Sequence, residues 1–224
     1  MSLNPETVNL YQATVRVLSD RPTQPVDAVF FHARSHGDNT GLIEIVGEMV
    51  AAGRAEFVAI TNNEGERWGS HLPYEATPGK TEYKRYLIAN GVPENKIVTP
   101  DLQAFNTREE NAAFVEQAAK ERWTTGAILT QPHQLLRTML GAVQAMNQLG
   151  YIMELYAITP TTTPWQELVR GNQGIEEKAR EEHIKAEYER IVLRQSTGEL
   201  ATFDELFAYW NQRGSLRLTR GLSA

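Results

Sequence analysis

The sequence contains no cysteine among its 224 residues. This absence excludes disulfides, thiolate metal sites and a cysteine nucleophile. Basic residues are also in the minority, because 22 Lys and Arg face 28 Asp and Glu and leave a formal net charge of −6. Non-specific binding of nucleic acid depends on a basic face, so we expect no nucleic-acid partner.

Long hydrophobic runs are missing as well. No apolar stretch approaches the length needed to cross a bilayer, and the first residues lack a basic segment followed by an apolar one. We therefore expect no membrane partner and a cytoplasmic protein. The length suits a single domain, residues 1–224, with a core at about 26–160, an N-terminal helix at 4–19 and a C-terminal helical extension at 165–215.

Three catalytic or phosphate-binding motifs are absent. No GxGxxG follows the first apolar segment, and no GxSxG supplies a serine nucleophile. The tripeptide GKT at 79–81 resembles part of a phosphate-binding loop, but Tyr74 stands where the earlier glycine would be.

Short apolar segments do recur, with helix-length spacers between them. The predicted strands are 26–32, 57–61, 96–99, 126–130 and 152–159. Alternation of strands and helices at intervals of about thirty residues is typical of a parallel, doubly wound sheet with right-handed crossovers.

Both ends of the chain carry helix signals, and the charged run at 175–195 predicts a helix with a solvated charged face. Asn4 and Pro5 suit the cap and first position of a helix, and Thr202 with Glu205 forms a capping-box pattern. The apolar residues that follow, Trp210 among them, are expected to pack on the core or on a second subunit. A homodimer through the C-terminal helices is therefore a hypothesis.

Polar residues gather after every predicted strand. In an open parallel sheet, ligands bind beyond the carboxyl ends of the strands, so we expect a small-molecule site there. The stretch HARSHGDNTG, residues 32–41, would form its first wall. Asp38 and Asn39 suit a ligand site and a turn or helix cap equally well.

Two helix starts lie at this edge. Thr107 with Glu110 matches a capping box, which leaves Asn106 free to face a ligand. His133 follows Pro132 at a helix N-terminus, where the dipole favours a neutral ring. Arg137 lies one turn further along and needs an anionic partner, which is a ligand or one of three glutamates. These glutamates are Glu82, Glu109 and Glu110.

A metal could in principle be held by His32, His36 and Asp38. Their spacing matches no standard site, so we expect no metal. Three aromatic residues, Trp68, Phe105 and Trp165, are candidates for stacking on a base, although such residues more often serve packing.

The segments NGVPENKIV, FNTREEN and LTQPHQLLRTM, in this order on successive strand–helix units, resemble the YdcF/SanA/ElyC-like family, a domain of unknown function. The likeness spans about 26–159 and is nearest to the soluble YdcF-like branch. It implies a Rossmann-like three-layer α/β/α fold with a mostly parallel five-stranded sheet and extra N- and C-terminal helices. It also implies a site at the carboxyl edge, and for the YdcF branch it suggests S-adenosylmethionine.

The resemblance carries over position by position. Glu82 and Glu109 match two family glutamates, and with His133 they are the candidate catalytic residues. The family asparagine falls at Glu110, or at Asn111 if one residue is inserted. The strand ends and the resemblance together give the candidate ligand-binding residues, which are Arg34, His36, Asn39, Asn62, Asn63, Asn106, Thr107, Thr130, Gln131 and Arg137.

Three functions remain open from the sequence. The first is a protein that binds a nucleotide-like or adenosyl-containing molecule, with transferase chemistry as one use of that ligand. The second is a hydrolase or transferase acting on an anionic or phosphorylated metabolite, with arginines holding the anion and Glu82 or Glu109 as acid and base. The third is a non-catalytic interaction protein that uses its terminal helices.

Overall fold

The computed structural model describes residues 4–34, 38–39, 41–66, 76–170 and 177–220. His36 and Trp68, both named as candidates above, lie outside these ranges. The helices are α1 (Pro5–Ser19), α2 (Leu42–Ala51), α3 (Gly79–Ala89), α4 (Thr107–Glu121), α5 (Pro132–Leu149), α6 (His183–Ser196) and α7 (Phe203–Arg220), with single 3-10 turns η1 (Glu94–Lys96) and η2 (Arg180–Glu182).

All five predicted strands are present and form one parallel sheet in the order β5-β2-β1-β6-β7. Its strands are β1 (Val26–Phe31), β2 (Ala55–Ile60), β5 (Ile97–Val98), β6 (Thr125–Leu129) and β7 (Glu154–Ile158). Numbered by their place in the sheet's chain order, the strands run 3-2-1-4-5, which is the doubly wound order with its switch point between β1 and β6.

Two small antiparallel hairpins were not predicted. The first pairs β3 (Glu64–Glu66) with β4 (Ala76–Pro78), and the second pairs β8 (Leu168–Arg170) with β9 (Glu177–Ala179). The second hairpin lies where the sequence predicted only helices. Strands of three residues are too short to give an alternation pattern, so periodicity could not reveal them.

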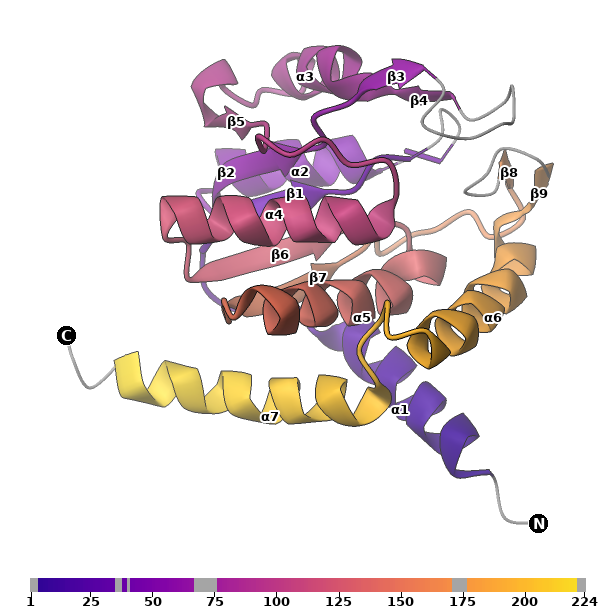
Figure 1. Ribbon diagram of the computed structural model, residues 1–224. Coiled ribbons are helices and arrows are strands. Elements are labelled where there is room, and N and C mark those ends of the chain that lie inside the picture. Colours follow the sequence, from indigo (N-terminus) through magenta and orange to yellow (C-terminus); the bar gives the residue numbers. More distant parts are fainter. Residues whose placement is uncertain (1–3, 35–37, 40, 67–75, 171–176, 221–224) are drawn as a thin grey trace.

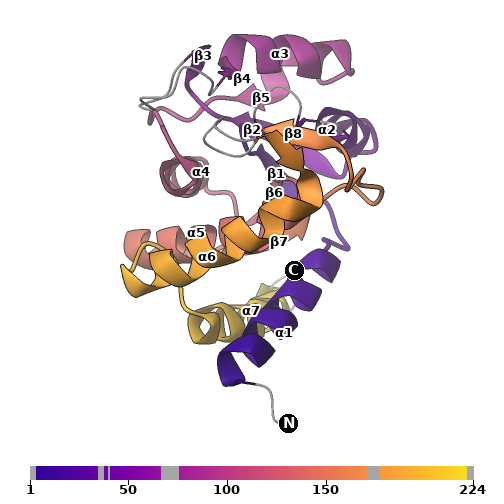
Figure 2. The same cartoon turned by 90° about the vertical axis from the view of Figure 1, so that its right-hand side faces the viewer.

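Helices cover both faces of the sheet, which confirms the three-layer prediction (Figures 1 and 2). Figure 1 shows α4 and α5 in front of the sheet and α2 behind it. Successive strand residues alternate between two buried clusters, so Phe30 packs with α4, α5 and α7, whereas Phe31 packs with α2 and α3. This alternation follows from the two-residue period of a strand.

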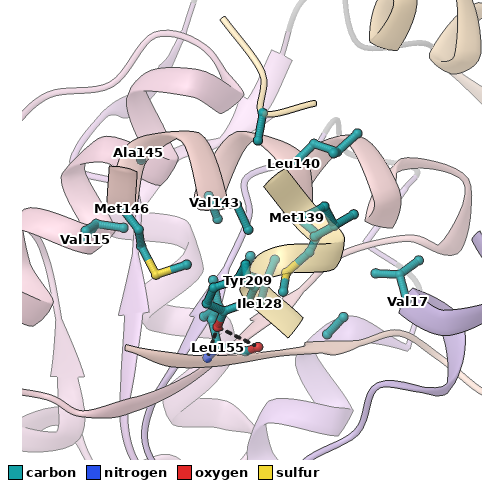
Figure 3. Close-up of a cluster of buried hydrophobic side chains, with 14 of the residues drawn as sticks. Val17, Val115, Ile128, Met139, Leu140, Val143, Ala145, Met146, Leu155 and Tyr209 are labelled. Carbon is teal, nitrogen blue, oxygen red and sulfur yellow. Dashed lines mark hydrogen bonds between the residues drawn. The ribbon is translucent and has the colours of Figure 1, made fainter. Parts of the chain in front are cut away.

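The terminal helices complete the α4–α5 layer. Figure 3 shows Tyr209 of α7 against β7, where its hydroxyl accepts a hydrogen bond of 2.7 Å from the Leu155 amide. Trp210 is buried, and its indole donates to Asp20 at 3.0 Å. This helix therefore packs on the chain's own core, which was one of its two predicted partners.

The predicted caps at both ends are confirmed. Asn4 accepts from the Glu6 amide at 3.0 Å, with Pro5 at the first helical position. Thr202 and Glu205 form a capping box. The Thr202 amide donates to the Glu205 carboxylate at 2.6 Å, and the Glu205 amide donates to the Thr202 hydroxyl at 3.2 Å. Both signals are local, so the sequence alone was sufficient to find them.

Between α4 and α5 the helices approach closely. A Cβ atom on Gly141 of α5 would lie 2.6 Å from Nδ2 of Asn111 on α4. That amide nitrogen donates to the Thr138 carbonyl at 3.2 Å. Glycine at this position therefore lets the first turns of α4 reach the carboxyl edge of the sheet beside α5.

Candidate functional site

At the switch point, the loop after β1 lies beside the loop after β6. Each strand ends in register with its neighbour, because Phe31 pairs with Leu129. The first loop carries Arg34 and Asp38. The second loop leads into α5, whose first turn carries His133 and Gln134. Ligand sites of doubly wound sheets form at this place.

Arg34 and Asp38 form a buried ion pair. The Arg34 Nε atom donates to Asp38 Oδ2 at 2.8 Å, and the guanidinium also donates to the side-chain amide oxygen of Gln134. Its backbone amide donates to the Tyr83 hydroxyl at 2.9 Å. Arg34 is only 5% exposed. The arginine that was predicted to hold a ligand is thus held by protein groups in this structure.

A second arginine reaches the same carboxylate from the C-terminal segment. Arg180 is fully buried and donates from Nε to Asp38 Oδ1 at 3.1 Å. Its other nitrogens donate to the Pro164 carbonyl at 2.6 Å and to Glu167 at 2.8 Å. Burial opposes ionisation of Asp38, but the two guanidinium groups outweigh it and lower the pKa of the carboxyl.

Sequence reasoning missed Arg180. It stands in a run of charged residues that predicted a solvent-exposed helix face, and no local signal distinguishes it from its neighbours. Its partner Asp38 lies 142 residues away along the chain.

Helix α6 covers the two candidate residues of α5. His133 and Arg137 are one turn apart on α5, and they face His183 and Glu187, which are one turn apart on α6. The two imidazole rings lie 6.1 Å apart, and Arg137 donates from Nε to Glu187. The carboxylate partner of Arg137 is therefore Glu187, and the prediction of Glu82, Glu109 or Glu110 in that place was wrong.

His133 is neutral, as the sequence predicted, although for a stronger reason than the helix dipole. Its side chain is 2% exposed. Burial, with Arg34 adding to it, lowers the pKa of His133 to about 3. A ring with this pKa does not exchange protons efficiently near neutral pH.

The two candidate catalytic glutamates have partners on the surface. Glu82 on α3 forms an ion pair of 2.5 Å with Arg85. Glu109 accepts a hydrogen bond of 2.7 Å from the Phe105 amide, while its own amide donates to the Asn106 side chain at 3.1 Å. Asn106 and Glu109 thus make the cap of α4, and the prediction of a Thr107–Glu110 capping box was wrong by one residue.

The remaining candidates lie at the carboxyl edge with different contacts. Asn62 donates to the Asp101 carbonyl at 3.2 Å and accepts from Lys80 at 3.3 Å. Gln131 donates to the Asp38 carbonyl at 2.9 Å, and Asn39 donates to the Arg34 carbonyl at 3.5 Å. These three side chains tie loops together. Thr107 is the first residue of α4.

A row of buried polar side chains crosses four strands at this edge. Phe31 is in register with Ile60 and Leu129, and Leu129 with Ile158. The residues that follow these four are, in sheet order, Thr61, His32, Thr130 and Thr159, and each is at most 5% exposed. We call them the polar row. By strand alternation they face α4 and α5.

Each member of the polar row has an unpaired atom. Within the part of the chain that the structure describes, these atoms have no hydrogen-bond partner. They are Thr61 Oγ1, His32 Nε2, Thr130 Oγ1 and Thr159 Oγ1. Both amide atoms of Asn63, two residues after Thr61, are unpaired in the same way. Each such buried group costs about 1–3 kcal/mol, so a cluster of them needs an explanation.

His32 is oriented by Glu110. The imidazole Nδ1 lies 3.1 Å from Glu110 Oε2, and the other carboxylate oxygen accepts from the Ala33 amide at 3.2 Å. Glu110 is 3% exposed on the first turn of α4. Sequence reasoning did not pair His32 with Glu110, because their contact spans 78 residues.

The arginines at this edge have carboxylate partners. Among the described residues, four guanidinium groups form ion pairs with the three carboxylates Asp38, Glu167 and Glu187, and the guanidinium groups are those of Arg34, Arg137, Arg180 and Arg190. Glu110 lies against His32 instead. A phosphate would therefore compete with these carboxylates for the arginines.

No metal cluster is evident in the described ranges. There, no group of three or more His, Asp or Glu residues is placed to hold an ion. His32 lies against Glu110, and Asp38 lies between two arginines. Equally, none of the described helices is long and apolar enough to cross a membrane.

Comparison of the sequence with protein-family models and with curated proteins finds no match. Among solved structures, two crystal structures of pantothenate synthetase from Thermus thermophilus are similar. The first has a TM-score of 0.37 at 13% identity over 91% of this chain and 79% of that one. The second has a TM-score of 0.36 at 13% identity over 89% and 79%. Likeness at this level carries no argument about function.

Proposed function

We propose that this protein binds an adenosyl-containing or otherwise nucleoside-like small molecule at the carboxyl edge of its sheet, between β1 and β6. The observation that carries the proposal is the polar row with its four unpaired buried atoms. A ligand that supplies partners to these atoms removes their cost and gains affinity from it. The switch-point position of the row supports the same place.

The ion pairs of the arginines favour a ligand without a polyphosphate. Arg34 and Arg137 were the candidates to hold an anion, and both are paired with buried carboxylates. A nucleoside triphosphate would have to displace Asp38 or Glu187 and leave it buried without a partner, which is costly. S-adenosylmethionine and its demethylated product carry no phosphate and suit this edge better than ATP or ADP.

The resemblance to YdcF-like proteins agrees with this choice of ligand. Glu110 and Asn111, after the α4 cap, are buried, whereas Glu109 is only half-buried. We therefore place the glutamate and asparagine of that family at Glu110 and Asn111, with one residue inserted after Thr107. Membership of the family is itself part of the proposal.

Entry of a ligand requires that a covering segment move. The unpaired atoms of the polar row are shielded from solvent. The described segment 177–196, from β9 to α6, is joined to this edge by the Arg180–Asp38 and Arg137–Glu187 pairs. Ion pairs reform readily after separation, so we propose this segment as the cover that opens.

Hydrolysis or group transfer on an anionic metabolite has less support. The acid–base residues considered for it, Glu82 and Glu109, serve a surface ion pair and a helix cap. Arg34 and Arg137 each have a carboxylate partner, and the buried Nη2 atom of Arg137 has no hydrogen-bond partner within the described residues. We keep this reaction as the alternative that would replace adenosyl binding if phosphorylated compounds stabilised the fold.

A homodimer remains a proposal for the whole chain. Phe203, Leu206, Tyr209 and Trp210 of α7 are buried in the chain's own core. In contrast, α6 leaves Ile184, Val192 and Leu193 exposed. We propose that α6, rather than α7, forms the contact between two copies.

A thermal-shift titration tests the ligand. The panel holds S-adenosylmethionine, its demethylated product, ATP, ADP and sugar nucleotides, each with and without a divalent metal. At 100-fold excess over the dissociation constant, a ligand stabilises the fold by about 2.7 kcal/mol. We expect a shift with the two adenosyl compounds and none with ATP or ADP.

Thr130→Val is the matched variant for this titration. It removes one unpaired hydroxyl at nearly constant volume, so we expect the adenosyl shift to shrink while the unliganded protein stays as stable as before or becomes more stable. Thr197→Val, on the surface at the end of α6, is the control. A panel without any shift would contradict the proposal.

A further inference from the structure

His32, the second member of the polar row, has a hydrogen-bond partner among the described residues on only one side of its ring. Its ring is 2% exposed and lies edge-on to Phe30, with ring centroids 4.5 Å apart. One ring nitrogen faces Glu110 at 3.1 Å, and the other has no partner within the described chain. The ring is therefore fixed in place while half of its hydrogen-bonding capacity is unused.

Glu110 decides which ring nitrogen carries the hydrogen. One carboxylate oxygen accepts from the Ala33 amide, and the other lies 3.1 Å from the ring Nδ1. The neutral tautomer that fits this contact carries its hydrogen on Nδ1, where it faces a carboxylate oxygen. The Nε2 atom is then an acceptor, and its partner must be a donor.

Hydroxyl groups flank this acceptor on both sides. Thr61 and Thr130 precede and follow His32 in the polar row, on strands about 4.8 Å apart. A threonine hydroxyl both donates and accepts. The row thus presents acceptor and donor–acceptor groups at regular intervals along one line, and none of these atoms has a partner among the residues described.

We propose that the polar row is a subsite for the hydroxyl groups of a sugar, with His32 Nε2 accepting a hydrogen bond from one of them. Neighbouring sugar hydroxyls also donate and accept, so one can bond to His32 while the next bonds to Thr61 or Thr130. Neither charge nor metal is needed. The ribose of a nucleoside fits this chemistry, so the inference rests on the proposed function and specifies which part of the ligand the row recognises.

Isothermal titration calorimetry on the full chain tests the subsite with adenosine, 2′-deoxyadenosine, 3′-deoxyadenosine and adenine. We expect at least one deoxynucleoside to bind about 10-fold or more weakly than adenosine, because loss of the hydroxyl leaves a buried acceptor unpaired. The wild-type comparison alone decides this point, so it does not depend on whether any variant folds.

His32→Phe identifies the residue that reads the hydroxyl. The variant keeps an aromatic ring against Phe30 but has no acceptor, so we expect the ratio between adenosine and the deoxynucleoside to fall toward one. Thr61→Val, which leaves the His32–Glu110 contact intact, should reduce the ratio less. An undiminished ratio in His32→Phe would overturn the role of His32.

Failure of the subsite and failure of the proposed function differ in outcome. If S-adenosylmethionine or its demethylated product binds, while adenosine and its deoxy forms bind equally or not at all, the row does not recognise ribose and only the subsite is overturned. If no adenosyl compound or nucleoside binds, both proposals are overturned.

Discussion

At the scale of single residues, the decisive feature is that charged side chains at this edge are buried and paired. Asp38 is the clearest example. One of its oxygens accepts from Arg34, four residues away, and the other accepts from Arg180, 142 residues away. Removing one partner of a buried pair leaves uncompensated charge, which is more destabilising than the pair itself is stabilising.

We therefore expect Asp38→Asn to lower the free energy of unfolding by about 3–5 kcal/mol, because two guanidinium groups lose their carboxylate inside the protein. Urea denaturation measures this value. Asp101→Asn is the control, since its ion pair with Lys120 is exposed and worth about 1 kcal/mol or less. Equal effects of the two substitutions would contradict the buried pairing.

His133 gives a prediction for acid stability. Arg34, Asp38, His183 and Glu187 face it, and burial is the largest cause of its pKa of about 3 in the folded chain, against an ordinary value of 6.5. Between these values the unfolded chain binds a proton that the folded chain does not. His133 therefore does not reduce the free energy of unfolding above pH 6.5. As the pH drops from 6.5 toward 3, His133 lowers the free energy of unfolding by at most about 1.4 kcal/mol per pH unit.

Urea unfolding at several pH values between about 7.5 and 5, which spans the ordinary titration range of histidine, checks this slope. His133→Gln has no titrating ring, so it should lose part of the decline in stability across that range. The same slope in both proteins would show that His133 does not titrate differently on folding.

At the scale of elements, α6 is the least expected part of the structure. The sequence predicted a helix with a solvated charged face there, and the helix is present. Its inner face, however, carries His183 and Glu187 against α5. Hydrophobic periodicity could find the helix but could not show that a polar face was buried.

Glu187→Gln tests the attachment of α6. Glu187 is 2% exposed and bonds to both Arg137 and Arg190. We expect its loss to destabilise the chain by about 3 kcal/mol or more and to speed hydrogen exchange in α6. Glu189→Gln, two residues away on the exposed side, should change neither quantity.

At the scale of the whole molecule, the exposed apolar side chains bear on association. Ile184, Val192 and Leu193 stay exposed on α6, whereas Phe203, Leu206 and Trp210 of α7 are buried. A second copy is thus expected on α6. Sedimentation velocity should show a dimer, and Leu193→Glu should shift it toward monomer.

Tyr11→Glu, on an exposed face of α1, is the control for that measurement. A wild-type monomer at all accessible concentrations would reject the homodimer. Loss of the dimer in the α1 variant rather than in the α6 variant would move the contact to the N-terminal helix.

The sequence by itself determined the five strands, their carboxyl edge and the caps of the two terminal helices. Strand patterns and capping residues act over a few residues, so they can be recognised wherever they occur. The five strands and the caps at Asn4 and Thr202 are examples. The cap of α4 was misplaced by one residue because two glutamates follow one another there.

Only the tertiary structure decided which charged groups pair and which polar atoms stay unpaired. Arg137 had several glutamates to choose from in the sequence, and it pairs with one 50 residues away. The polar row exists because four strands end at the same level, which depends on their register in the sheet. Register and remote pairing depend on how the layers pack, and no pattern confined to one segment contains that information.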